Sequence, residues 1–530
     1  MDNRARLTEM RAAERLAARD VTLFSDPAMA SYRLGWIGLP ARAGRDTEVL
    51  SRLGDDVATL GITDVVLLGM GGSSLAPLVL SRILGSAPDC PVLHVLDTTS
   101  PDAVTSLMLA LRPSTTLVLV SSKSGTTSEP LALSAVFREW MAEDLIEDTG
   151  SHFMAVTDPG SPLQTYAAEN GFARVFHAPS DVGGRYAALT PFAMVPAAMI
   201  GLDIRRLAAA GASIEAACAA DSPANPGLAL AAWLADAYGA GRDKLAITCS
   251  PAYAAFGLWI EQLVAESTGK GGRGLLPVLE AAPGAPASHG ADRMTFVLRS
   301  SDDAALASLG TRLPDEEPLF EVVLDDEWAI AGEFVRWEWA VALFSALNGI
   351  EPFDQPDVAA AKTATERILT AGVPAQSEFP AIPVASDRLA PALRDLIANA
   401  APGTYVAVLA YLPDDPALLE PLVSACASLA EARRIAVTLE IGPRYLHSTG
   451  QYHKGGPETG VFLVVGVSPV TDARVPGKPY TLGMLNRAQA QGDVIALREH
   501  GRPVVHVELA DPGRASVQTV ADALIAATRP

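Results

Sequence analysis

A run of hydroxyl side chains with one lysine and one glycine follows a short apolar segment, at Ser122-Lys-Ser-Gly-Thr-Thr127. The residues before it, Leu117 to Val120, are all apolar, which predicts a strand covered on both faces of a sheet. A helical pattern begins near Pro130, and a helix N-terminus at the end of a strand offers unpaired amides and a positive dipole end. A helix cap needs one hydroxyl residue, whereas six lie between Ser121 and Ser128. The segment therefore predicts a site for a dianion such as a phosphate monoester.

Two further segments carry side chains suited to proton transfer. Gln262 and Glu266 are four residues apart on one face of a predicted helix, which Gly269 ends. Lys362 lies two turns into another predicted helix, which opens at Asp354-Gln-Pro-Asp357. Taken alone, a glutamate or a lysine on a helix usually faces solvent, so these residues gain meaning only beside the other motifs.

A glycine-rich turn, Gly69-x-Gly71-Gly72, follows the predicted strand Val65 to Leu68. One interpretation is a dinucleotide-binding turn with Asp97 as the ribose carboxylate, but the third glycine of that motif is replaced by Ser74. A crowded turn that faces the neighbouring hydroxyl loop explains the glycines better. A Rossmann dehydrogenase is therefore the weaker alternative.

The composition indicates which classes of partner the chain avoids. Its 530 residues include 40 basic and 61 acidic side chains, a net charge of −21, which repels nucleic acid and anionic membranes. The N-terminus has no apolar core typical of a signal peptide, and the most apolar window, Pro191 to Leu202, is too short to span a bilayer. We expect a cytoplasmic protein with reduced thiols, since four distant cysteines fit neither a disulfide framework nor a zinc site: Cys90, Cys218, Cys249 and Cys426.

Strand and helix patterns alternate along most of the chain, which predicts a doubly wound α/β fold with parallel sheets. We expect four parts: a helical arm at 1–58, an α/β domain with the hydroxyl loop at 59–205, a second α/β domain at 206–372, and a C-terminal α/β domain at 373–530. The Ala/Pro-rich stretch from Gly372 to Pro383 is interpreted as a linker.

Five motifs, taken together, resemble the phosphoglucose isomerase family in order. They are Gly71-Gly-Ser73, Ser122 to Thr127, Gly183-Gly-Arg-Tyr186, Glu266-Ser-Thr-Gly-Lys270, and Phe353-Asp-Gln355 with Lys362. The resemblance covers residues 60 to 365 and implies two sugar isomerase (SIS) domains. The chain looks most like the isomerase half of bifunctional transaldolase/phosphoglucose isomerase proteins, and no separate transaldolase half is evident.

The resemblance implies roles for these residues in the interconversion of glucose 6-phosphate and fructose 6-phosphate, a step of glycolysis and gluconeogenesis. Glu266 would move a proton between C2 and C1 through a cis-enediol, Arg185 would stabilise the enediolate, and Lys362 would assist ring opening. The family needs no metal or other cofactor, and it forms homodimers. The substrate-binding residues would be Gly72, Ser73, Ser122, Lys123, Ser124, Thr126, Thr127, Gly184 and Gln262.

The chain departs from the family in the histidine that opens the sugar ring. The family places it between the Glu and Lys motifs, where this chain has only His289, in an Ala/Pro/Gly stretch. A similar cluster, Leu446 to Gly456, follows Lys362 and contains His447. We favour His447, because a Gly-, Ser- and His-rich loop between two strands is typical of a functional loop, but a structural loop histidine is the alternative.

Two other functions remain open. The chain could also act on mannose 6-phosphate, or it could be a non-catalytic SIS-domain sensor of sugar phosphates. A sensor needs only the phosphate loop, so Glu266, Arg185 and Lys362 in the family's order favour the enzyme.

Overall fold

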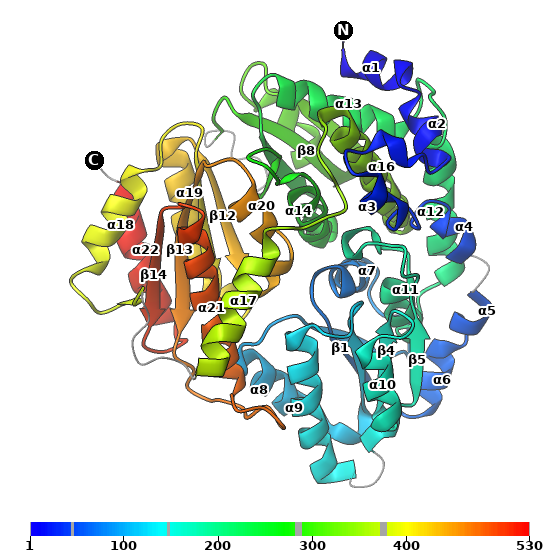
Figure 1. Cartoon of the computed structure of the whole chain (residues 1–530), viewed down its shortest axis with the longest axis vertical. Coiled ribbons are helices and arrows are strands. Elements are labelled where there is room, and N and C mark those ends of the chain that lie inside the picture. Colours follow the sequence, from blue (N-terminus) through cyan, green and yellow to red (C-terminus); the bar gives the residue numbers. More distant parts are fainter. Residues whose placement is uncertain (1, 44–46, 146–148, 281–288, 372–378, 529–530) are drawn as a thin grey trace.

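The computed structural model describes residues 2–43, 47–145, 149–280, 289–371 and 379–528. These residues form three α/β units, each built on one parallel sheet, and a helical arm at the N-terminus (Figure 1). The predicted α/β class, with two parallel-sheet units and a further unit at the C-terminus, is confirmed. Across the described ranges, no helix is both long and apolar enough to cross a membrane.

The first sheet has the strand order β2-β1-β3-β4-β5, with all neighbouring strands parallel. Its strands are β1 (Asp64–Leu68), β2 (Val92–Leu96), β3 (Thr116–Ser121), β4 (Phe153–Thr157) and β5 (Arg174–His177). Leu68 of β1 pairs with Val120 of β3, so the loops after these two strands leave the sheet side by side. The strand order reverses at this place, because β2 lies on one side of β1 and β3 lies on the other. Open α/β sheets bind ligands at such a reversal, outside the carboxyl ends of the strands.

Alternate residues of β1 and β3 enter two different cores, because helices cover both faces of the sheet. Leu67 and Leu119 face one core, and Leu68 and Val120 face the other. Burial on both sides explains why these strands are continuous apolar runs in the sequence. The helices of this unit are α7 (Leu75–Leu84), α8 (Pro101–Ala110), α9 (Ser128–Leu145), α10 (Pro162–Glu169) and α11 (Pro191–Met199).

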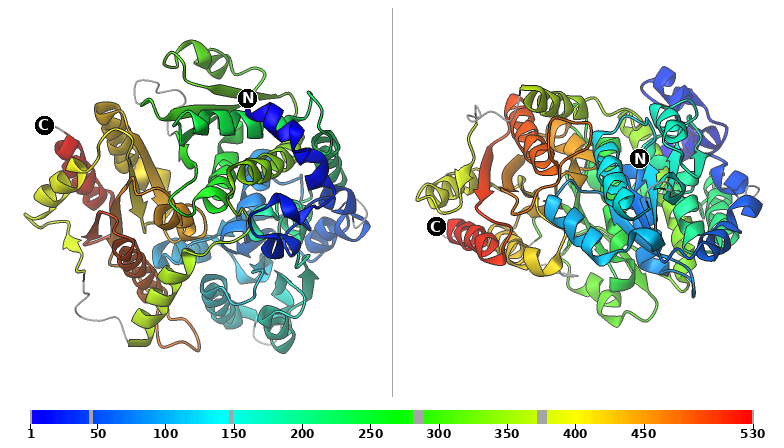
Figure 2. Two further views of the ribbon diagram at one scale, coloured as in Figure 1. Left: turned by 45° about the horizontal axis from the view of Figure 1, so that its top comes forward. Right: turned by 90° about the horizontal axis from the view of Figure 1, so that it is seen from below.

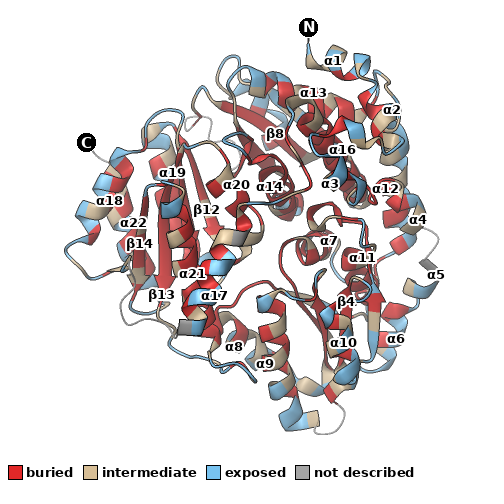
Figure 3. Cartoon of the chain, in the orientation of Figure 1, coloured by how far each residue is buried: buried red, intermediate tan, exposed pale blue. Residues whose placement is uncertain are grey.

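The second sheet has the order β7-β6-β8-β9 and is also parallel. Its strands are β6 (Lys244–Cys249), β7 (Leu276–Leu279), β8 (Arg293–Ser300) and β9 (Leu319–Leu324), and its helices include α12 (Ile204–Cys218), α13 (Pro226–Gly239), α14 (Ala254–Thr268) and α16 (Ile330–Asn348). Helix α14 follows β6 and is buried along almost its whole length, between its own sheet and α7 of the first unit (Figure 3).

The third sheet has the order β10-β14-β13-β11-β12. Its strands are β10 (Ile382–Pro383), β11 (Tyr405–Ala410), β12 (Ala436–Ile441), β13 (Gly460–Val467) and β14 (Val504–Leu509). Helices α18 (Leu389–Ala398), α19 (Pro416–Arg433) and α22 (Arg514–Thr528) cover one face, and α20 (Gly450–Gly455) and α21 (Leu482–Glu499) cover the other. Most of the predicted linker, 372–378, lies outside the described residues, but Ile382 and Pro383 pair with β14.

The third unit is joined to the rest of the chain by a shared core. Tyr405 and Tyr452 of the third unit pack with Ala265, Leu276 and Val278 of the second unit. Helix α17 (Val358–Ala371), which carries Lys362, packs along α21 of the third unit (Figures 1 and 2). The C-terminal unit is therefore in position to contribute to a site at the carboxyl end of the first sheet.

The N-terminal arm wraps around the second unit and reaches the first. Its helices are α1 (Asn3–Glu9), α2 (Ala12–Ala17), α3 (Pro27–Ser31), α4 (Leu39–Ala43), α5 (Thr47–Leu50) and α6 (Leu53–Thr59). Helix α1 packs on α13, α4 packs on α12, and α6 packs on α11. Leu34 forms an antiparallel bridge with Val182, so the arm also touches the loop before Gly183.

Candidate active site

The loops at the carboxyl ends of β1 and β3 line a cavity of about 600 Å³, which the other two units and the arm complete. The predicted site residues in its wall are Gly72, Ser73, Lys123, Ser124, Thr127, Gly184, Arg185, Gln262, Glu266, Lys362 and His447. Ser122 is buried beneath this wall, and Thr126 lines a neighbouring cavity of about 560 Å³. Residues from all parts of the chain thus meet in one place.

Hydrogen bonds among its own residues hold the hydroxyl loop in shape. The Ser122 hydroxyl accepts a hydrogen bond from the Gly125 amide at 3.2 Å and donates to the Thr127 hydroxyl at 3.2 Å. The hydroxyls of Ser124 and Thr126 are 2.9 Å apart. Gly125 has a φ of +67°, and a Cβ there would lie 2.6 Å from a backbone nitrogen, so the turn requires glycine. The loop is therefore preformed.

The glycine pairs of two motifs allow two loops to touch. A Cβ on Gly72 would lie 2.0 Å from the carbonyl oxygen of Gly184. The first glycine pair precedes Ser73 and the second precedes Arg185, so this contact brings a hydroxyl and a guanidinium to the same cavity. Close approach of backbones therefore explains Gly72 in the turn after β1, in keeping with the crowded-turn interpretation.

Lys123 does not present a free charge to the cavity. Its ammonium lies 2.5 Å from Oδ2 of Asp158, which directly follows β4, and donates to the carbonyl of Ser180 at 3.2 Å. Burial raises the pKa of Asp158, and pairing with Lys123 limits that rise. The carboxylate thus offsets the charge of the lysine in the hydroxyl loop.

Glu266 is a buried carboxylate with a guanidinium beside it. Its side chain lies on α14, 5% exposed, so the ordinary solvent-facing position of a helical glutamate does not apply. Its Oε2 atom is 3.3 Å from Nη1 of Arg185 and 3.4 Å from Nε2 of Gln262. Burial raises the pKa of Glu266, and Arg185 opposes that rise. A carboxylate with a raised pKa in a cavity is suited to accept and return a proton.

Arg185 is held in place from several sides. It donates to the carbonyls of Pro352 and Asp354 at 2.6 and 2.7 Å and to the Ser267 hydroxyl at 3.1 Å. The segment that opens the Phe353-Asp-Gln motif therefore fixes the guanidinium next to Glu266. A cation held in this way is preorganised for a developing negative charge.

Two lysines lie near this segment and differ in their surroundings. Lys270 is buried and paired with Asp354 at 2.7 Å, and burial together with Arg185 lowers the pKa of Lys270 to about 7. Lys362, on α17, is exposed and forms no hydrogen bond or ion pair with any described residue. Its ammonium is available to a ligand in the cavity.

His447 enters the cavity from the C-terminal unit, and both its side chain and its backbone carbonyl are hydrogen-bonded. Its Nε2 atom is 3.0 Å from Oε1 of Glu129, and its carbonyl accepts a hydrogen bond from Gln262 at 2.8 Å. Glu129 is 4% exposed and also accepts from Gln489 at 2.8 Å. Burial alone would raise its pKa, but the charge and hydrogen bond of His447 outweigh burial and hold the pKa of Glu129 at about 2.

The loop that carries His447 is anchored to the other two units. Arg444 forms two hydrogen bonds to Asp97 in the first unit, at 2.7 and 2.9 Å. Ser448 donates to Glu261, on α14 of the second unit, at 2.9 Å. Asp97, which the weaker sequence interpretation assigned to a ribose, is therefore bound to an arginine.

His289, the other candidate for ring opening, lies outside the cavity wall. Its Nε2 atom is 2.5 Å from Glu280, and its Nδ1 atom is 2.9 Å from Glu317. Burial would lower its pKa, but the two carboxylates outweigh burial and raise the pKa of His289 to about 9. These contacts give His289 a structural place beside the second sheet, since its two glutamate partners also bind Thr248 of β6 and Thr295 of β8.

Sequence reasoning missed three residues: Arg33 in the cavity wall, and Glu129 and Gln489, which line the neighbouring cavity. Glu129 is adjacent to the hydroxyl loop, but an acid in the first turn of a helix is ordinarily explained by the helix dipole. Gln489 and Arg33, which lines the cavity from the arm, lie far from every motif. No spacing in the sequence signals either of them.

The site can be compared with known proteins. Residues 51–274 match the family model "Phosphoglucose isomerase", a range that contains Ser73, the hydroxyl loop, Arg185 and Glu266. A glucose-6-phosphate isomerase of Thermus thermophilus is 38% identical over 176 residues, 33% of this chain and 41% of the relative. That of Rubrobacter xylanophilus is 32% identical over 274 residues, 50% of this chain and 62% of the relative.

Two solved structures share the fold. A hypothetical protein from Thermus thermophilus has a TM-score of 0.59 and 25% identity, and the match covers 70% of this chain and 96% of the other. A glucose-6-phosphate isomerase from Chlamydia trachomatis has a TM-score of 0.53 and 21% identity, covering 62% of this chain and 75% of the other. The chain spans between 41% and 62% of the two curated relatives in sequence. Over residues 51–274, then, this chain is similar to phosphoglucose isomerases, and its cavity lies largely within that region.

Proposed function

We propose that this chain is a glucose-6-phosphate isomerase, which interconverts glucose 6-phosphate and fructose 6-phosphate through a cis-enediol. The observation that carries the proposal is the buried Glu266 carboxylate, 3.3 Å from Arg185, in one cavity with the hydroxyls of Ser73, Ser124 and Thr127. The similarity of residues 51–274 to phosphoglucose isomerases supports it.

Each group in the cavity has a task in this reaction. The hydroxyl loop and Ser73 hold the phosphate, which anchors the sugar and positions its other end. Glu266 takes the proton from C2 and returns it to C1, a general-base step worth about 10²- to 10⁴-fold. Arg185 stabilises the negative charge that develops on the enediolate oxygen.

Ring opening precedes the proton transfer and needs different groups. The imidazole of His447 moves a proton between O1 and O5 of the pyranose, and the free ammonium of Lys362 assists at the ring. Glu129 orients the imidazole and balances its charge when it is protonated, since Nε2 and the carboxylate are 3.0 Å apart. Gln262 lies between His447 and Glu266 and fixes their relative position.

The test is an assay on fructose 6-phosphate in which the product glucose 6-phosphate is oxidised by a coupled dehydrogenase. Turnover by the wild-type protein that is strongly reduced in Glu266→Gln supports the isomerase. Repeating the assay with mannose 6-phosphate decides whether the second aldose is also a substrate. Tight binding of a sugar phosphate without any turnover would instead identify a sensor.

We also propose that the protein is a cytoplasmic homodimer and that it corresponds to the isomerase half of the bifunctional transaldolase/phosphoglucose isomerase proteins. The unpaired state of its four cysteines is in keeping with a reducing compartment. Light scattering of the purified protein measures the oligomeric state. An assay for transaldolase activity tests whether this chain has the second reaction.

A further inference from the structure

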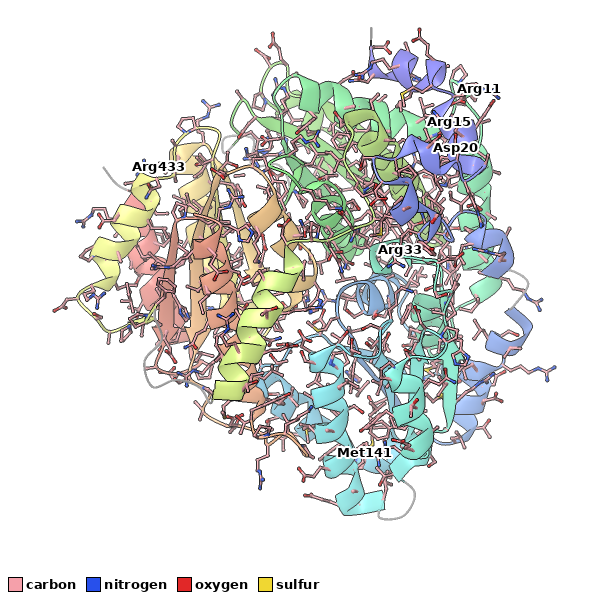
Figure 4. The ribbon with its side chains drawn as sticks, in the orientation of Figure 1. Arg11, Arg15, Asp20, Arg33, Met141 and Arg433 are labelled. Atoms are coloured by element: carbon pink, nitrogen blue, oxygen red, sulfur yellow. The ribbon has the colours of Figure 1, made fainter. Side chains whose placement is uncertain are left out.

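The N-terminal arm reaches the phosphate end of the cavity. The antiparallel bridge between Leu34 and Val182 and the hydrogen bond from the Gly35 amide to the carbonyl of Asp181, at 3.0 Å, fix the arm against the loop before Gly183. Arg33 directly precedes this contact, and its Cδ atom lies 3.8 Å from where a Cβ on Gly183 would be. Figure 4 labels Arg33 where the arm meets the first unit.

The charge at this end of the cavity is balanced before a substrate enters. Lys123, the cation of the hydroxyl loop, is paired with Asp158 at 2.5 Å. The second oxygen of Asp158, Oδ1, is buried and has no hydrogen-bond partner among the described residues. A phosphate dianion bound to the hydroxyl loop would therefore face a carboxylate as well as an ammonium, and their charges offset each other.

Arg33 is a second cation near Lys123, and both side chains donate to the carbonyl of Ser180. It is partly buried and lines the same cavity as Lys123, Asp158 and Ser124. Its hydrogen bonds within the described residues are both donated by Nη1, to the carbonyls of Tyr32 and Ser180 at the long distances of 3.5 and 3.4 Å. The other N–H groups are free to make the paired hydrogen bonds that a guanidinium forms with phosphate oxygens.

We propose that Arg33 binds the phosphate dianion of the substrate. Its positive charge compensates for that of Lys123, which the carboxylate of Asp158 offsets. The N-terminal arm is then part of the substrate-binding site, and it selects ligands that carry the phosphate. The identity of the sugar rests on the proposed function. The recognition of a phosphate dianion by Arg33 does not depend on it.

The test measures binding by calorimetry, with 6-phosphogluconate and inorganic phosphate as probes. Arg33→Met should raise the Kd of both probes about 5- to 20-fold, the loss expected for one charge-assisted contact that solvent partly screens. The KM for fructose 6-phosphate should rise by a similar factor while kcat changes by less than about twofold. Arg33→Lys should restore part of the affinity, and Arg33→Gln, which keeps a donor without charge, should restore less.

Arg112→Met is the matched control, because Arg112 is an exposed arginine at the amino end of β3, away from the cavity. It should leave both Kd values unchanged. An unchanged Kd for phosphate in Arg33→Met would overturn the proposal, as would an equal loss of affinity for gluconate, which lacks the phosphate. If the wild-type chain binds 6-phosphogluconate through Arg33 but isomerises no sugar phosphate, the proposed function fails and this inference stands.

Discussion

The Nε2 atom of His447 lies 3.0 Å from Oε1 of Glu129, although 318 positions separate the two residues in the chain. Glu129 lies in the first turn of the helix that follows the hydroxyl loop, and His447 ends a short helix of the C-terminal unit. Gln489, on α21 of the same C-terminal unit, binds the same carboxylate oxygen at 2.8 Å. One buried carboxylate therefore ties the C-terminal unit to the helix after the hydroxyl loop and sets the orientation of the imidazole.

Glu129→Gln should slow ring opening more than proton transfer. The substitution removes a charge-assisted hydrogen bond to His447, a loss of about 10-fold or more in a step that uses the imidazole. Turnover of the cyclic sugar should fall by that factor, whereas proton exchange on an open-chain substrate analogue should fall much less. His447→Gln should show the same pattern, and the double variant should be no slower than His447→Gln.

His289→Gln is the control for this experiment, since His289 is also a histidine bound to glutamates but lies outside the cavity wall. Its effect should be on stability and not on the ratio of the two rates. Equal losses on cyclic and open-chain substrates in His447→Gln, or a selective loss only in His289→Gln, would contradict the assignment.

The Glu129 carboxylate should also make the native state depend on pH in the acid range. Its pKa is lowered from an ordinary value of 4.5 to about 2, so its contribution to stability is present above about pH 4.5 and is lost as the pH falls towards 2. The difference in thermal midpoint between the wild-type protein and Glu129→Gln should therefore shrink between pH 5 and pH 3. A difference that stays constant over this range would show that the carboxylate is not paired as described.

Glu266→Gln should lower kcat by at least about 100-fold with little change in KM, because it removes the proposed base and leaves the proposed phosphate contacts intact. The steady-state parameters on fructose 6-phosphate provide the measurement. Glu338→Gln is a matched control: Glu338 is equally buried, and burial raises its pKa well above the ordinary value, so an amide resembles its protonated form. Near-normal turnover in Glu266→Gln would show that Glu266 is not the general base.

Ser124→Ala and Thr127→Ala should weaken inhibition by 6-phosphogluconate and leave folding intact. Both hydroxyls face the cavity, and a lost hydrogen bond to a charged phosphate costs about 1.5 to 3 kcal/mol, or roughly 10- to 150-fold in the inhibition constant. Ser428→Ala, an exposed hydroxyl on α19, serves as the control. Unchanged inhibition in the two loop variants would mean that these hydroxyls only cap a helix.

The sequence predicted those parts of the site that local rules determine. Leu117 to Val120 had to form a strand buried on both faces, and a loop rich in hydroxyls at its end had to lie where parallel sheets bind ligands. The glycine pairs were interpretable as close contacts, and Gly72 meets Gly184 in the structure. Each of these inferences depends on a short run of consecutive residues.

The contacts between units could not be predicted in the same way. Nothing in the spacing of Arg33, Glu129 or Gln489 indicates that Arg33 lines the cavity or that Gln489 binds the carboxylate of Glu129 beside it, because these positions depend on how the arm and the C-terminal unit pack on the first sheet. The burial of α14 was also not predicted, since a glutamate on a helix usually faces solvent, whereas here Ser448 of the third unit binds Glu261 and Arg185 of the first unit lies beside Glu266.

The cavity contains Glu266 and His447 of the same chain, which predicts that each chain has a complete site even if the protein is a dimer. Specific activity should therefore stay constant when the enzyme is diluted below the concentration at which a dimer dissociates. The measurement is initial rate per chain over a wide range of enzyme concentration, with light scattering to follow the oligomeric state.

A complementation experiment sharpens this prediction. Glu266→Gln and His447→Gln are mixed, unfolded and refolded together, so that any dimers exchange their subunits. If the base and the histidine of one site came from different subunits, about half of the dimers would be mixed and each would regain one intact site, restoring about a quarter of the wild-type activity. Because both residues line the cavity of one chain, the mixture should be no more active than the average of the two variants. Recovery near a quarter would show that a neighbouring subunit supplies His447.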